Sequence, residues 1–198
     1  MERRVKGSLF VDYVRMLRSR KDVDWSRYLR PEDLPYLSDR IHPEGWYPMD
    51  TFARLGLAIL DEIARGDTFL ARAWGRMSLD YLATVHAGFL VPGDPRESLM
   101  RLIVLRGSFF DFDAVSLPQL TDTHATVRVQ YGMTARAEEA ASYQTLGFFG
   151  RLVELAGGVG VLTEFTRKSW EGSEVTEFTV DWQAPAKDSS SGLRPSTR

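Results

Sequence analysis

Residues 143–158 read YQTLGFFGRLVELAGG, and this stretch decides the fold of the chain. Its apolar side chains recur every three or four positions, which places them on one face of an α-helix. The pair Gly157 and Gly158 ends that helix, because glycine favours the left-handed conformation in which helices commonly stop. We therefore predict a long helix that packs one face against another layer of the protein.

Segments of alternating polarity lie on both sides of this helix. Residues 161–166 and 176–182 follow it, and residues 110–113 and 125–131 precede it. Alternation of apolar and polar side chains predicts four strands, paired as two hairpins, with a turn around Pro118 in the first hairpin. A single hairpin is marginal in water, so we expect the strands to merge into one antiparallel sheet with the helix across one face.

The N-terminal half has a helical pattern. Apolar stripes predict helices over residues 9–17, from Asp50 to Gly66, over residues 67–90 and over residues 96–106. In the third of these helices the stripe is formed by Leu70, Ala73, Trp74, Met77, Tyr81, Val85 and Phe89. We expect this stripe to face the core.

These patterns together predict an α+β fold in one domain, residues 1–183. A helical half, residues 1–106, packs with a four-stranded antiparallel sheet in a ββαββ half, residues 107–183. Residues 184–198 contain mainly Ser, Pro and charged residues, so we expect a disordered tail there.

Composition excludes several classes of protein. The chain of 198 residues is 43% hydrophobic, which is enough for one substantial core. Its net charge of −2 provides no field that attracts nucleic acid or an anionic membrane. The absence of cysteine removes disulfides, thiolate nucleophiles and Cys-ligated metals. With no apolar run of signal-peptide or membrane-span length, we expect a cytoplasmic protein.

No catalytic signature stands out. The histidines His42, His86 and His124 are far apart and lack the spacing of metal ligands. Asp111 and Asp113 share one side of a predicted strand and could act as paired carboxylates, although the solvated face of a hairpin also explains them. No Gly-x-Ser-x-Gly nucleophile motif is present. We therefore expect a protein that is not an enzyme and has no dedicated metal site.

Two glycines inside the long helix, Gly147 and Gly150, need an explanation. Each costs about 1 kcal/mol relative to alanine in a helix interior. Something should therefore approach the helix closely at these positions. Tight packing on another helix or on the sheet is one explanation, and a ligand against bare backbone is the other.

Several short motifs, in this order of elements, resemble a known superfamily. They are the start Val5-Lys6-Gly7-Ser8-Leu9-Phe10, the Trp46-Tyr47-Pro48 before a helix, the pair Gly75-Arg76, and the closing helix with its hairpin. Over most of residues 5–183 the chain resembles haem-nitric-oxide-binding (H-NOX) and four-vinyl-reductase domains. It looks closest to a haem-less, uncharacterised set of paralogues from myxobacteria. The resemblance implies a small-molecule sensor or carrier with an apolar pocket between the helical half and the sheet, and it implies dimers in several members.

The resemblance also bears on haem. The haem-binding branch has a proximal His before the first hairpin and a Tyr-x-Ser-x-Arg motif that grips the propionates. Here residues 99–104 contain no His, and Tyr131-Gly-Met-Thr-Ala-Arg136 lacks the Ser and has its Arg displaced by one position. The resemblance therefore implies a module without a cofactor. A haem-based gas sensor with His86 as the iron ligand is the alternative.

We expect a non-enzymatic sensory or regulatory module that binds an apolar small molecule, or a partner protein, between its helical layer and its sheet. Elements predicted to face each other supply the candidate lining. These ligand-binding candidates are Trp74, Met77, Tyr81, Phe110, Gly147, Phe149, Gly150 and Phe178. The same residues could instead form solid core. A dimer that contacts proteins through an exposed helix or strand edge, without a small ligand, is a further alternative.

Overall fold

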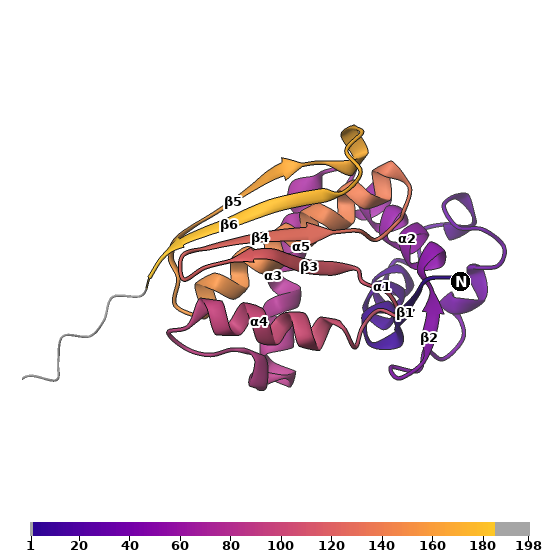
Figure 1. Ribbon diagram of the computed structural model, residues 1–198. Coiled ribbons are helices and arrows are strands. Elements are labelled where there is room, and N and C mark those ends of the chain that lie inside the picture. Colours follow the sequence, from indigo (N-terminus) through magenta and orange to yellow (C-terminus); the bar gives the residue numbers. More distant parts are fainter. Residues whose placement is uncertain (1, 185–198) are drawn as a thin grey trace, which may run out of the picture.

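A four-stranded antiparallel sheet with a long helix along one face forms the C-terminal half of the computed structural model (Figure 1), which describes residues 2–184. The sheet order is β3-β4-β6-β5. Its elements are β3 (Val115–Leu120), β4 (His124–Val129), α5 (Ala135–Leu155), β5 (Val159–Arg167) and β6 (Thr176–Gln183). The predicted α+β class and ββαββ order are confirmed.

The interface between α5 and the sheet is the solid core of this half. Leu146, Phe149 and Leu152 of α5 are buried, as the predicted stripe requires. From the sheet, Phe178 meets Phe149 edge to face, with ring centroids 5.9 Å apart. The helix ends where predicted, because Gly157 adopts a left-handed φ of 96°.

The first strand of the sheet differs from the prediction. Residues 110–113 form no strand beyond a single bridge between Phe110 and Val5, and β3 begins only at Val115. Pro118, expected in a turn, lies within β3. The strand tolerates it because β3 is an edge strand and its pairing shifts register between Ser116 and Gln119.

Residues 4–58 of the N-terminal half lie together at the right in Figure 1, whereas its two later helices, residues 68–85 and 95–106, pack against α5. The longer elements of this half are β1 (Arg4–Lys6), α1 (Gly7–Ser19), β2 (Trp46–Pro48), α2 (Met49–Ala58), the π-helical turn η3 (Ile59–Ile63), α3 (Thr68–Val85) and α4 (Pro95–Arg106). Short 3-10 turns are η1 (Trp25–Arg27), η2 (Leu34–Leu37), η4 (Ala87–Phe89) and, after β5, η5 (Ser169–Glu171).

Several helix boundaries differ from the sequence prediction. The helix predicted from Asp50 begins one residue earlier, at Met49, so that Asp50 lies in the first turn of α2, and α3 stops at Val85 instead of continuing to residue 90. Asp67 and Asp94 do cap α3 and α4, because their carboxylates accept hydrogen bonds from the backbone N–H groups of Phe69 and Glu97.

The predicted inward stripe of α3 is wrong over much of its length. Met77 and Tyr81 are 68% and 60% exposed, and the residues of α3 that are buried are Gly75 and Leu79. The reason is a close crossing with α5. A Cβ atom added at Gly75 would lie 1.8 Å from the carbonyl oxygen of Gln144. The glycine face of α3 therefore packs inward, and the bulky stripe turns outward.

Gly147 and Gly150 have the packing role that was one of their two explanations. A Cβ atom at Gly147 would lie 2.0 Å from the carbonyl oxygen of Arg72 on α3. At Gly150 the nearest atom would be the Thr163 methyl group of β5, at 3.1 Å. The first glycine thus permits a helix crossing, and the second permits close contact with the sheet.

Two observations complete the architecture. Among the helices of residues 2–184, none combines the length and apolar character needed to cross a bilayer. The predicted tail, apart from Ala184, lies outside the described residues.

Candidate functional site

A cavity of about 360 Å³, here called the junction cavity, lies between the helical half and the ββαββ half. Its wall comes from α1, α3, the end of α4, the segment after β4, and α5. The wall includes Tyr13, Trp74, Arg106, Phe110, Tyr131 and Phe148. A volume of this size lies within the range of small-molecule pockets, and aromatic side chains are their common lining.

A rigid loop positions Tyr131 in this wall. The buried carboxylate of Glu138 accepts hydrogen bonds from the backbone N–H groups of Tyr131 and Met133, at 3.0 and 2.9 Å. The turn at Gly132 has a φ of 73°, which favours glycine. The Tyr131 hydroxyl lies 2.7 Å from Thr145 Oγ1 on α5. The β4–α5 loop is therefore held from both sides.

Arg106, the last residue of α4, brings a positive charge to the junction cavity. Its Nη2 donates a hydrogen bond to the Tyr131 hydroxyl at 3.0 Å. Its guanidinium carbon lies 5.7, 5.5 and 5.9 Å from the ring centroids of Phe110, Phe148 and Phe149. Its Nε is buried and has no hydrogen-bond partner.

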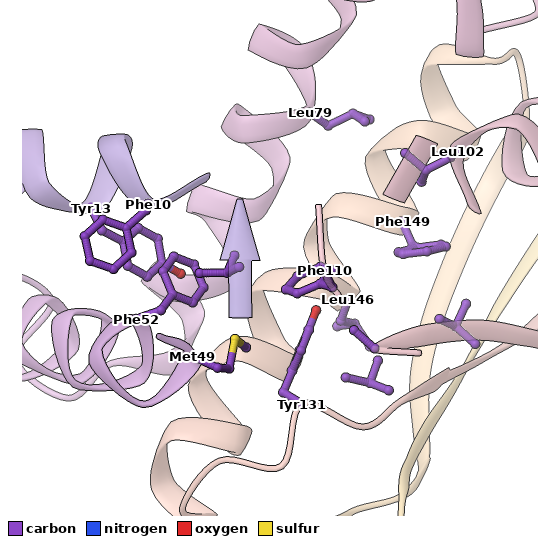
Figure 2. Packing of buried hydrophobic residues seen from close by; sticks show 14 of the residues in the cluster. Phe10, Tyr13, Met49, Phe52, Leu79, Leu102, Phe110, Tyr131, Leu146 and Phe149 are labelled. Carbon is purple, nitrogen blue, oxygen red and sulfur yellow. The ribbon is translucent and has the colours of Figure 1, made fainter. Parts of the chain in front are cut away.

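Tyr13 belongs to a wall that separates the junction cavity from a second one. Its hydroxyl donates a hydrogen bond to Gln144 Oε1 at 2.7 Å, and its ring stacks on Phe52 at 4.3 Å (Figure 2). Burial raises the pKa of Tyr13, so the phenol stays neutral. A side cavity of about 350 Å³ lies beyond this wall, lined by α2, η3, α3 and α5, and it shares Tyr13, Phe52, Trp74 and Gln144 with the junction cavity.

The structure brings half of the predicted ligand-binding residues to a cavity. Trp74 borders both cavities, Tyr81 and Phe110 border the junction cavity, and Met77 borders the side cavity. The other four, Gly147, Phe149, Gly150 and Phe178, border neither of these cavities and lie in the packing between α5 and its neighbours. Phe149 and Phe178 are fully buried in solid core.

His86 lies at the rim of the junction cavity. It follows α3 as the C-cap residue, and its side chain is exposed. The sequence placed it within a longer predicted helix, residues 67–90, beside the apolar stripe. The early end of α3 at Val85 removes it from that environment.

The paired carboxylates considered from the sequence do not form a site. Asp111 lies outside the strands, and its carboxylate accepts hydrogen bonds from the backbone N–H and Nε of Arg4, both at 2.7 Å. Within residues 2–184, no group of three or more His, Asp or Glu side chains is arranged to hold a metal ion.

Sequence reasoning missed one polar row on the outer face of the sheet. His124 Nδ1 lies 2.7 Å from Asp181 Oδ1, and its Nε2 lies 3.2 Å from Thr126 Oγ1. A hydroxyl, an imidazole and a carboxylate in this order are the parts of a nucleophile with its base. The row borders neither of the two cavities. His124 and Asp181 meet only through the pairing of β4 with β6, which no local sequence signal reveals.

Comparison with solved structures identifies the fold of this chain. No family profile and no curated protein sequence matches this chain. A Fe(II) unliganded H-NOX protein variant from K. algicida matches at 14% identity and a TM-score of 0.58, over 90% of this chain and 96% of that chain. A variant of the T. tengcongensis H-NOX matches at 12% identity and 0.60, over 92% and 100%. An oxygen-binding H-NOX domain related to soluble guanylate cyclases matches at 11% identity and 0.60, over 92% and 97%. The chain therefore has the H-NOX fold.

Proposed function

We propose that this chain is a non-enzymatic sensory or regulatory module that binds an apolar small molecule in the junction cavity. The observation that carries the proposal is the cavity itself, about 360 Å³ in volume, with eight aromatic residues in its lining beside aliphatic and polar ones. Solved proteins of the same fold support it, since one of them is an oxygen-binding domain.

The position of the cavity suggests how binding is communicated. Tyr13 and Trp74 belong to the helical half, whereas Tyr131 and Phe148 belong to the ββαββ half. A ligand in contact with both sets binds most tightly to one arrangement of the two halves, and so favours that arrangement. Sensing would then be a shift in how α1 and α3 sit on the other half.

A neutral fluorescent probe, 1-aminoanthracene, tests binding directly. Ser78 borders the junction cavity from α3, and a Ser78→Phe variant fills the space beside it. Thr84→Phe is the matched control, because Thr84 is exposed on the same helix and borders neither of the two cavities. We expect saturable binding that Ser78→Phe weakens at least tenfold and Thr84→Phe leaves unchanged. Equal binding by both variants would place the probe elsewhere and contradict the proposal.

The residues around the junction cavity do not fit a haem. Haem iron is held by a His, Cys or Tyr side chain, or by Met together with His. His86 is exposed at the rim, and the hydroxyls of Tyr13 and Tyr131 are already hydrogen-bonded. Helix α4 contains no His, and its inward residues are Leu99 and Leu102. We therefore propose that the module works without haem.

Reconstitution distinguishes the haem alternative. Protein incubated with haemin and freed of excess should show no Soret band beyond that of a nonspecific control protein. A stoichiometric Soret band that disappears in His86→Ala would instead establish a haem-based gas sensor.

The outward stripe of α3 supports a second candidate function, contact with a second copy of this chain. Leu70, Met77, Tyr81 and Val85 follow one another along one side of the helix and are all exposed. Contiguous exposed apolar side chains commonly mark protein interfaces. Light scattering should show a dimer that Met77→Lys dissociates, while Leu162→Lys, at an exposed leucine on β5, leaves it intact. A monomer at all concentrations would remove this candidate.

A further inference from the structure

Arg106 is a half-buried cation without a counter-charge. Within residues 2–184 it forms no ion pair with a carboxylate, its Nε is buried without a partner, and its one hydrogen bond goes to a neutral phenol. Other half-buried arginines of this chain differ. Arg54 holds Asp33 through two nitrogens, and Arg76 holds Glu154 in the same way.

The surroundings of Arg106 do not replace an anion. The three phenylalanine rings around its guanidinium provide cation–π attraction, but an aromatic ring is a much weaker hydrogen-bond acceptor for Nε than a carboxylate is. A buried charge and a buried unsatisfied donor are both unfavourable unless a partner is bound. The cavity beside Arg106 has room for that partner.

Among residues 2–184, the only carboxylate that borders the junction cavity is already engaged. Asp12 pairs with Arg15 at 3.6 Å, and its side chain remains 48% exposed at the opening. Within the described chain, Arg106 therefore has no carboxylate partner, and an anion that enters the cavity would supply one.

We propose that the ligand of the junction cavity is an apolar monocarboxylate whose carboxylate pairs with the guanidinium of Arg106. This inference rests on the proposed function and specifies the chemistry of its ligand. A planar carboxylate matches the donors along one edge of a guanidinium, which commonly bind it through two parallel hydrogen bonds. Arg15 also borders the cavity but pairs with Asp12, so Arg106 is the cation of the lining that lacks a counter-charge within residues 2–184. One such cation among aromatic rings favours a single negative charge on a hydrocarbon body over a multiply charged phosphate.

Tyr131 positions this anchor. Thr145 donates its hydroxyl hydrogen to the carbonyl oxygen of Ala141 at 2.8 Å, so the Tyr131 phenol donates to Thr145 Oγ1 and accepts from Arg106. Nη2 is thereby held against the wall, which fixes the orientation of the guanidinium beside the cavity. Tyr131 is a positioning residue in this arrangement, because its hydrogen is already used.

Calorimetry with matched probes tests the inference. Decanoate and 1-naphthoate represent alkyl and aryl carboxylates, and decanol and 1-naphthalenemethanol are their uncharged counterparts. We expect wild-type protein to bind at least one carboxylate ten or more times more tightly than its alcohol. Arg106→Gln should abolish that preference and leave alcohol binding within twofold. Arg101→Gln is the control, because Arg101 is exposed on the same helix and pairs with Glu97 at 2.8 Å.

The outcomes separate the two proposals. Equal binding of acid and alcohol by wild-type protein would overturn the carboxylate inference while the apolar cavity stands, and this comparison needs no variant to fold. Binding of no probe at all would overturn the proposed function and this inference with it. An acid preference that survives Arg106→Gln would assign the anion to another residue.

Discussion

The crossing of α3 and α5 makes a quantitative prediction for Gly147→Ala. The added methyl group would lie 2.0 Å from the carbonyl oxygen and 2.9 Å from the carbonyl carbon of Arg72. Both are backbone atoms, which cannot rotate away, so the two helices must separate. Overpacking a close-packed core costs about 1–3 kcal/mol and sometimes more, and rigid partners place this site at the upper end.

Helix propensity acts in the opposite direction. Replacing glycine by alanine in a helix interior contributes about 1 kcal/mol of stability. The expected net loss is therefore about 2 kcal/mol, which for a protein of this size lowers Tm by roughly 4–8 °C. Thermal unfolding followed by circular dichroism measures it.

Gly150→Ala is the matched control on the same helix. It has the same gain in helix propensity, but its methyl group meets only the Thr163 methyl at 3.1 Å. We expect its stability to stay within about 1 kcal/mol of wild type. Gly75→Ala should resemble Gly147→Ala, and the double variant should lose less than the sum, because the helices separate only once. A Gly147→Ala protein as stable as wild type would refute the crossing geometry.

Three further predictions follow from polar contacts. Burial alone would raise the pKa of Asp33, but hydrogen bonds, led by those from Arg54, lower it below its ordinary 3.8. The pair should therefore stabilise the fold above about pH 4, and this contribution is lost as pH falls through the folded-state pKa. In urea unfolding, Asp33→Asn should be about 3 kcal/mol less stable than wild type at neutral pH and should lack that loss of stability in acid. An unchanged acid slope in the variant would contradict this assignment. Glu138→Ala leaves two loop N–H groups unpaired and should cost about 2–4 kcal/mol in urea unfolding, whereas a loss under 1 kcal/mol would show that the loop holds itself. Tyr13→Phe removes the hydrogen bond to Gln144 and should cost about 1–2 kcal/mol in the same assay, and no loss would mean that water replaces the hydroxyl.

Local periodicity was sufficient for the elements whose environment is simple. Along α5 the predicted stripe is buried, as Leu146, Phe149, Leu152 and Val153 show. In β6, the buried Phe178 and Val180 alternate with the partly buried Glu177 and Thr179, whereas the edge strand β5 alternates between partly buried and exposed residues. A side chain in these elements faces either water or the core, and the apolar–polar pattern of the sequence predicts which of the two.

Pro118 shows where local signals mislead. Proline usually marks a turn, but at the edge of a sheet the N–H it lacks is not needed. Whether a strand is at an edge depends on the order of all four strands. That order is a property of the assembled sheet and is absent from the residues of β3.

By itself, the sequence determined the α+β class, the ββαββ order and the closely approached glycines of α5. Only the tertiary structure decided which side of α3 faces inward. This helix has bulky apolar residues on one side and Gly75 on another, and the Gly75 side packs inward because it allows the backbones of α3 and α5 to touch where they cross. The same packing leaves the junction cavity and brings Arg106 to Tyr131. These two residues are far apart in the chain and come into contact because of how whole helices pack, which the local spacing of residues does not predict.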